Sequence, residues 1–270
     1  MQPPPVVFTD EWRSLLARQW SLWGRLTDDE RAHIERMTPR FIAEKRWEAA
    51  NGFELTEPMQ VLIAAQACLL LLGFVADTGD DPADADDAGV FDLYRGVGTV
   101  LVHPTTVVLE GQRATGTAGL VSSDPYAIAG QAAFGGPTVL AWDAVVNEAR
   151  HPGRGENVVY HEFAHKLDML DGVLDGTPPM VDGAARQRWI EVCTREFRAL
   201  SRGLGGPLLR DYGAENPAEF FAVATEVFFT KPVSMRADKP DLYAALAGFY
   251  RQDPASRFPA PVPGELPIVC

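Results

Sequence analysis

Cysteine is scarce in this sequence. Only Cys68, Cys193 and Cys270 occur in 270 residues, and they lie far apart. An odd number of widely spaced cysteines gives neither a disulfide framework nor a cysteine-based zinc site. Because disulfides are rare where thiols are kept reduced, we expect a cytoplasmic protein. The first residues, Met1 to Pro5, also lack the basic segment and apolar core of a secretory signal peptide.

Basic residues and long apolar runs are also in short supply. The chain has 24 Lys and Arg against 37 Asp and Glu, a net charge of −13. Nucleic acids and anionic membranes need a basic surface, so neither is expected as a partner. The most apolar run, residues 59–75, is interrupted by Gln60 and Gln66 and is short for a membrane span, which predicts a buried helix. The acidic balance favours peptides with a free amino terminus or basic side chains.

Histidine is infrequent too, but two of the five histidines stand in one motif, H-E-F-A-H at residues 161–165. Residues four apart lie on one face of a helix, so the imidazoles of His161 and His165 can reach one metal ion. In H-E-x-x-H sites this ion is zinc, and the glutamate, here Glu162, acts as general base toward a water. Apolar flanks predict a buried helix from about 157 to 172. The alternative is a structural helix that carries two histidines by chance.

The third ligand must come from another residue type, because catalytic zinc usually has three protein ligands and no histidine follows His165. Glu219 is favoured, since a helix from later in the chain can bring its carboxylate to the metal and complete a His2Glu site. Asn216 before it also suits a capping box, in which Glu219 would only cap its helix. Glu226, two turns later, is a competing ligand or an acceptor for a histidine N–H. Asp171 would ligate only if the metal helix broke sharply.

Tyr212 precedes Glu219 by seven residues, in a segment that contains Gly213. A phenol at this position can donate a hydrogen bond to the oxyanion that forms when water attacks a carbonyl. A tyrosine that only packs would look the same in the sequence, so both interpretations stay open.

The fold expected from periodicity is α+β, with mostly helical layers and a small mixed or antiparallel sheet beside the metal helix. Besides the metal helix and the helix capped by Thr56, helices are expected at residues 8–23, 27–37, 38–46, 184–200, 216–229 and 241–250. Strands are expected at residues 97–101, 105–109 and 138–142. The last is either a core strand or an edge strand to which a substrate peptide can be added.

One domain is expected over residues 8–255. It comprises a helical amino-terminal part at 8–75, an acidic loop at 76–89 and a catalytic part at 90–255, and a proline-rich tail follows at 256–270. The acidic loop lacks the ordered spacing and closing glutamate of an EF-hand, so calcium binding is not expected there.

Taken together, these residues resemble the Mlc titration factor A family of glucose-regulated zinc metallopeptidases, which is similar in its site to the catalytic domain of anthrax lethal factor. The matching stretches are H-E-F-A-H-K-L-D at 161–168, Tyr212, P-A-E-F-F-A-V at 217–223, E-V-F-F at 226–229, and residues 135–143. The resemblance covers most of residues 8–255.

The resemblance implies a zincin-like fold with one zinc ion held by His161, His165 and Glu219. It also implies that Glu162 is the general base and Tyr212 a catalytic oxyanion donor. The activity implied is that of an aminopeptidase that hydrolyses peptides with a zinc-activated water. The family further implies binding to the glucose repressor Mlc, which relieves repression of sugar uptake genes.

Two other functions fit the same motif. One is a regulatory repressor-binding protein in which the zinc site is structural or vestigial. The other is a metal-dependent hydrolase of non-peptide amides, because H-E-x-x-H specifies an activated water and not its target.

Overall fold

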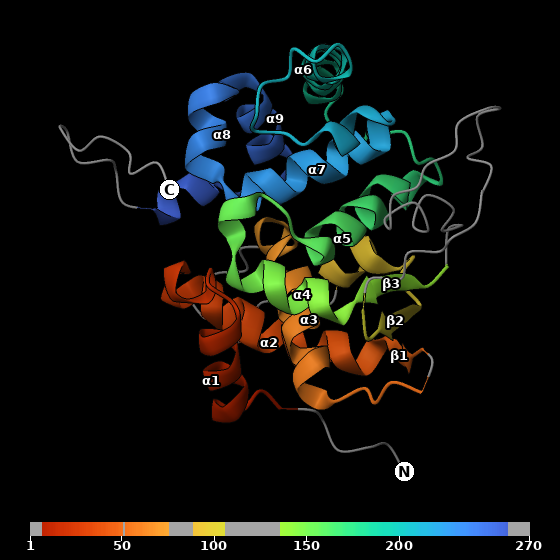
Figure 1. The fold of residues 1–270 in the computed structure, drawn as a ribbon, viewed down its shortest axis with the longest axis vertical. Helices are drawn as coiled ribbons and strands as arrows, with labels where there is room; N and C mark the ends of the chain where they lie inside the picture. The colour runs from red at the N-terminus through yellow and green to blue at the C-terminus, as the bar shows by residue number, and fades with distance from the viewer. Residues whose placement is uncertain (1–6, 51, 76–88, 106–135, 259–270) are drawn as a thin grey trace.

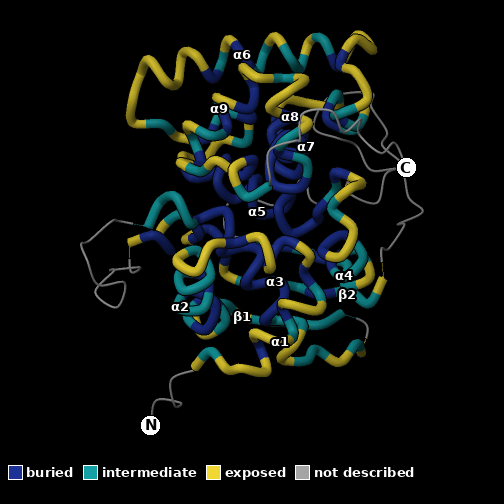
Figure 2. Tube along the Cα trace, turned by 90° about the vertical axis from the view of Figure 1, so that its left-hand side faces the viewer, coloured by how far each residue is buried: buried dark blue, intermediate teal, exposed yellow. Residues whose placement is uncertain are grey.

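Two buried helices form the centre of the molecule. The computed structural model describes residues 7–50, 52–75, 89–105 and 136–258 (Figure 1). Every residue of α5 (Val158–Asp168) is buried, and so is every residue of α7 (Pro217–Thr230) after its first. Figure 2 shows both helices enclosed by the rest of the chain. Helices that are buried on all sides must satisfy any polar side chain they carry within the protein, so their charged residues are the first candidates for function.

The remaining helices cover this pair on two sides (Figure 1). On the side of α5 lie α1 (Asp10–Gln19), α2 (Asp28–Glu44), α3 (Glu57–Leu69) and α4 (Trp142–Arg150). On the side of α7 lie α6 (Gly183–Ser201), α8 (Pro232–Asp238) and α9 (Pro240–Tyr250). Short 3-10 turns are found at Trp23–Arg25, Leu72–Phe74, Val90–Tyr94, Pro152–Arg154, Met169–Asp171, Asp211–Ala214 and Pro254–Arg257.

The sheet is parallel, so the expectation of a mixed or antiparallel sheet was wrong. Its order is β1 (Arg46–Ala49), β2 (Thr99–His103) and β3 (Thr138–Ala141), with both pairs parallel. Alternating burial indicates which face of a strand is covered but carries no information on direction. Direction follows from the connections: the chain between β1 and β2 passes through α3, and such long crossovers are what parallel strands need.

Two of the three expected strands are present. The strand expected at 97–101 lies at Thr99–His103, and the one expected at 138–142 ends at Ala141. The third, at 105–109, falls almost wholly outside the described residues, as do the acidic loop expected at 76–89 and most of the tail expected at 256–270. β1 was not expected from the sequence.

A break at Thr38–Pro39 was also expected, and α2 instead runs through it as one helix. Proline removes a helical N–H, which usually ends or kinks a helix. Here the Thr38 hydroxyl donates to the Ile34 carbonyl at 2.7 Å, and Pro39 is itself buried. Burial of Met37 and Phe41 on the same helix offsets the lost hydrogen bond.

α7 was expected to end at about Phe229, before Lys231-Pro232, and it ends one residue later, at Thr230. Pro232 also begins α8, which the sequence interpretation missed because proline suits both a helix end and a first helical turn. Among the described residues, no helix is both long enough and apolar enough to cross a membrane.

Candidate metal centre

The two motif histidines are positioned by the start of α5. Asn157 is its N-cap, and the Asn157 side-chain oxygen accepts from the Tyr160 N–H at 3.0 Å. From that start His161 and His165 fall one turn apart on one face, and their Nε2 atoms lie 3.2 Å from each other. Both side chains are almost completely buried, at 0% and 4% relative exposure. The helix thus aims two imidazole nitrogens at one buried point.

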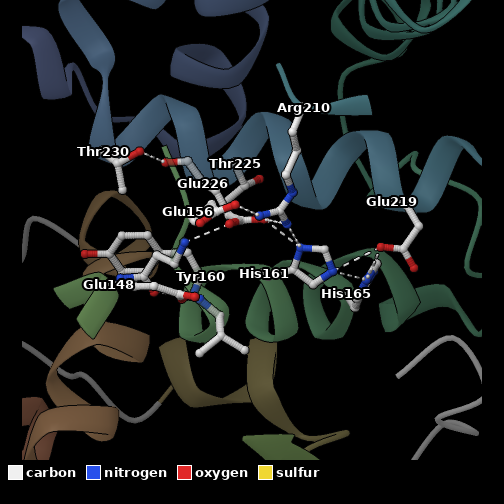
Figure 3. A network of polar contacts seen from close by, with 12 residues as sticks. Glu148, Glu156, Tyr160, His161, His165, Arg210, Glu219, Thr225, Glu226 and Thr230 are labelled. Atoms are coloured by element: carbon white, nitrogen blue, oxygen red, sulfur yellow. Dashed lines mark hydrogen bonds and ion pairs between the residues drawn. The ribbon is translucent and has the colours of Figure 1, made fainter. Parts of the chain in front are cut away.

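Glu219 reaches the same point from α7 (Figure 3). Asn216 caps this helix by accepting the N–H groups of Ala218 and Glu219, both at 3.0 Å, and Pro217 is its first residue. The carboxylate oxygen Oε2 of Glu219 lies 3.0 Å from His161 Nε2 and 3.4 Å from His165 Nε2. The cap that sets the helix start therefore also sets the place of this carboxylate.

The three atoms have the spacing of metal ligands. Nitrogen and oxygen ligands about 2.0–2.1 Å from a tetrahedral zinc lie about 3.3 Å from one another. The three observed separations are 3.0, 3.2 and 3.4 Å. Among the described residues, this trio is the one group of three metal-ligand side chains whose donor atoms come this close. Glu219 Oε2 is buried and has no hydrogen-bond partner of acceptable geometry within that part of the chain.

The electrostatics of the trio favour a cation. Burial lowers the pKa of His161, but its close contacts with Glu219 and Glu226 outweigh burial and raise it to about 10. Burial raises the pKa of Glu219, and the two imidazoles more than reverse that effect, so it lies well below its usual range. Without a metal, two carboxylates thus hold a proton on His161. A divalent cation at this point can take the place of that positive charge.

Glu226 contacts the far side of His161 and does not belong to the trio. Its Oε1 lies 2.7 Å from His161 Nδ1, and its Oε2 accepts the Asn157 backbone N–H at 2.7 Å. The Arg210 guanidinium donates to Oε1 at 2.6 Å, as Figure 3 shows. Glu226 therefore accepts an N–H from His161 Nδ1, with Nε2 of the same ring turned toward Glu219, and it ties the start of α5 to α7.

The other candidate residues lie around this centre. Glu162 is buried at 5% exposure, and burial raises the pKa of its carboxyl against the opposing charges of His161 and His165. The ring of Tyr212 lies beside His161, with ring centroids 5.9 Å apart. Asp171 is exposed and accepts the Val173 N–H at 3.0 Å; it is not part of the trio.

Two residues of the site were missed in the sequence. Arg210 contacts Glu226, and its guanidinium also lies over the Tyr212 ring, 5.6 Å from the centroid. Asp168, the last residue of α5, is completely buried. Asp168 closes the family-matching stretch at 161–168 and is a charged residue on a helix with apolar flanks, but neither signal gave it a role. For Arg210 there was no signal, because an arginine in a loop is usually exposed.

Comparison with known proteins gives consistent matches over nearly the whole chain. A family model described as glucose-regulated metallo-peptidase M90 matches residues 4–251. Mlc titration factor A of Edwardsiella ictaluri is 32% identical over 261 residues, which cover 95% of this chain and 92% of that protein. The protein of the same name from Salmonella agona is 31% identical, covering 86% and 83%. An uncharacterised Synechocystis protein is 30% identical, covering 90% and 84%.

Proposed function

The chain belongs to the glucose-regulated metallo-peptidase M90 family, and from this premise we propose that it is a zinc-dependent, aminopeptidase-type peptidase. Its ligands are His161, His165 and Glu219, in a zincin-like site of the gluzincin type. The observation that carries the proposal is the triangle of their three donor atoms, at 3.0, 3.2 and 3.4 Å. Two imidazoles and one carboxylate are a donor set that suits zinc and leaves one coordination position open. A zinc ion bound there supplies Lewis-acid chemistry, which makes water a nucleophile at neutral pH and polarises a carbonyl group.

Glu162 carries the proton in this proposal. It accepts a proton from the water whose oxygen attacks the scissile carbonyl carbon. It then gives the proton to the amine nitrogen as the C–N bond breaks, so the atoms and charges balance. A base that must also act as an acid works best with a pKa near the working pH, and burial moves the pKa of Glu162 upward, in that direction.

Tyr212 stabilises the negative charge that develops on the carbonyl oxygen. The support is its place beside His161 and the contact of its ring with the Arg210 guanidinium. Arg210 is in turn held by the buried carboxylate of Glu226 at 2.6 Å, so the phenol is attached to the same framework as the metal ligands. A donor fixed before the reaction is worth more than one that must reorient.

The substrate peptide is proposed to lie along β3. Among the described residues β3 pairs only with β2, and it contacts α5 directly. The buried Lys166 of α5 donates to the Gly136 carbonyl, two residues before β3, at 3.2 Å, which fixes this strand to the metal helix. A peptide added to the edge of β3 that pairs with no described strand makes main-chain hydrogen bonds that do not depend on its sequence.

Metal analysis joined to a screen of amino-acid p-nitroanilides tests the proposal. We expect one equivalent of zinc per chain and a hydrolysis that a chelator abolishes and added zinc restores. The variant Glu215→Gln, an exposed charge change just before α7, is the matched control and keeps full activity. Absence of bound zinc, or a hydrolysis indifferent to the chelator, contradicts the proposal. Amide hydrolysis without cleavage of peptides would assign the site to non-peptide substrates.

A second function is favoured by the relatives named Mlc titration factor A, which match at 31% and 32% identity. We propose that this chain also binds an Mlc-type transcriptional repressor and so regulates sugar uptake genes, in the cytoplasm. Titration of a purified Mlc repressor with the wild-type chain and with Glu162→Gln separates the two functions. Full binding by the inactive variant means that regulation does not need hydrolysis, whereas no binding by either chain refutes the second function.

A further inference from the structure

Asp168 is a completely buried carboxylate at the end of the metal helix, three residues after His165. One of its oxygens, Oδ2, accepts the Gly176 N–H at 2.7 Å. The other, Oδ1, has no hydrogen-bond partner within the part of the chain that the structure describes. A buried carboxylate with an unused oxygen is costly.

The imidazole of His165 also has a buried atom without a hydrogen-bond partner among the described residues. This atom is Nδ1. An imidazole that binds a metal through Nε2 carries its proton on Nδ1, and metal-binding histidines usually donate this N–H to a carboxylate or carbonyl. His161 already has such a partner in Glu226, at 2.7 Å. Residues three apart on a helix are neighbours, so both Glu162 and Asp168 adjoin His165. Of these two carboxylates, only Asp168 has a buried oxygen without a hydrogen-bond partner among the described residues.

The Gly176 turn connects Asp168 to the start of α7. Gly176 has φ +78°, and a Cβ added to it would lie 2.2 Å from the Pro217 carbonyl oxygen. The Trp189 indole N–H donates to the Gly176 carbonyl at 2.9 Å. The turn is therefore held between α5, α6 and the first residue of α7. Pro217 is two residues before Glu219, so a shift of the Gly176 turn would also shift the proposed third ligand.

We propose that Asp168 is a positioning residue of the metal centre. The structure does not contain a hydrogen bond between Asp168 Oδ1 and His165 Nδ1; in the proposal, Oδ1 accepts this N–H when the metal is bound. Its Oδ2 holds the Gly176 turn against the start of α7, which sets Glu219. Each ligand histidine then has its own carboxylate, Glu226 for His161 and Asp168 for His165. Since this proposal depends on the proposed zinc function, the test must tell the failure of one from the failure of the other.

The variant Asp168→Asn separates positioning from packing. The amide keeps the size of the side chain and an oxygen that can accept the Gly176 N–H, but it removes the negative charge and one acceptor. The matched control is Asp175→Asn, in the same turn. Asp175 is exposed, and its Oδ1 accepts the Thr177 N–H at 2.9 Å, a role that asparagine retains. Both variants change the net charge by one unit.

Zinc affinity of the metal-free proteins, measured by competition with a chelating dye, is the deciding quantity. We expect Asp168→Asn to lose about 10- to 100-fold in zinc affinity, the usual effect of removing such a carboxylate, and Asp175→Asn to stay near wild type. Wild-type affinity in Asp168→Asn overturns the proposal, whatever the unfolding midpoint of the metal-free variant. A wild-type chain that binds no zinc overturns the proposed function itself.

A second measurement does not depend on the folding of the variant. In zinc-loaded wild-type protein labelled with 15N-histidine, we expect His165 Nδ1–H to give a slowly exchanging, downfield proton signal, as a hydrogen bond to a carboxylate requires. A rapidly exchanging His165 Nδ1–H, next to a protected His161 signal, would refute the contact with Asp168.

Discussion

Replacing Glu226 by glutamine tests the arrangement around His161 most directly. Glu226 contacts three groups: His161 Nδ1 at 2.7 Å, the Asn157 N–H at 2.7 Å and the Arg210 guanidinium at 2.6 Å. Glutamine has the same shape, but one of its two terminal atoms is a donor. Whichever way the amide turns, at least one of these buried donors meets an N–H instead of an oxygen.

The expected loss follows from these contacts. Removing a carboxylate that orients a metal-binding histidine typically costs 10- to 100-fold in metal affinity, which corresponds to about 1.4–2.8 kcal/mol. The free energy of unfolding of the metal-free protein falls as well, by about 1–3 kcal/mol, because one buried donor is left without an acceptor. Both effects are expected in Glu226→Gln, since Glu226 contacts the ligand and the start of the metal helix at once.

Zinc competition and urea unfolding of the metal-free protein measure the two effects separately. Glu215→Gln is the matched control, because it makes the same chemical change at an exposed position before α7. If Glu226→Gln binds zinc within about threefold of wild type, well short of the effect of losing such a partner, His161 is not oriented by Glu226 and the reasoning fails. A loss of stability with unchanged zinc affinity would reduce Glu226 to a purely structural residue.

Three further outcomes are expected. Glu162→Gln keeps zinc and loses nearly all turnover, because the general base is gone. Persistent hydrolysis by zinc-loaded Glu162→Gln that contains no wild-type protein would refute this role. Tyr212→Phe lowers kcat by about 10- to 1000-fold if the phenol stabilises the oxyanion, and an unchanged kcat would return Tyr212 to a packing role. In the metal-free protein, His161 has a folded pKa of about 10 against an ordinary 6.5, so its stabilising contribution is complete below pH 6.5 and is lost as pH rises toward 10. Urea unfolding across that range should show the decline, and a flat free energy of unfolding would contradict it.

The local parts of the site could be predicted from the sequence. The spacing of His161 and His165 places them on one helix face, because helical geometry is the same in every context. Asn157 and Asn216 with Pro217 mark helix starts by local hydrogen bonding, and the observed helices begin beside them. The parallel direction of the sheet was not predicted, because burial patterns look the same in either direction and β1, which the crossover through α3 connects to β2, was not expected.

Tertiary packing decided which carboxylate lies beside both His161 and His165. Glu219 and Glu226 lie two turns apart on one face of α7, and both read as buried acids near a metal helix. The packing of α7 on α5 sets their offset: Glu219 lies at Nε2 of His161 and Glu226 at Nδ1. Tertiary packing also brings Arg210 to Glu226 and buries Asp168 at the end of α5. Local sequence fixes which side chains share a helix face because their spacing is a property of the backbone, whereas the relative position of two helices depends on all the side chains packed between them.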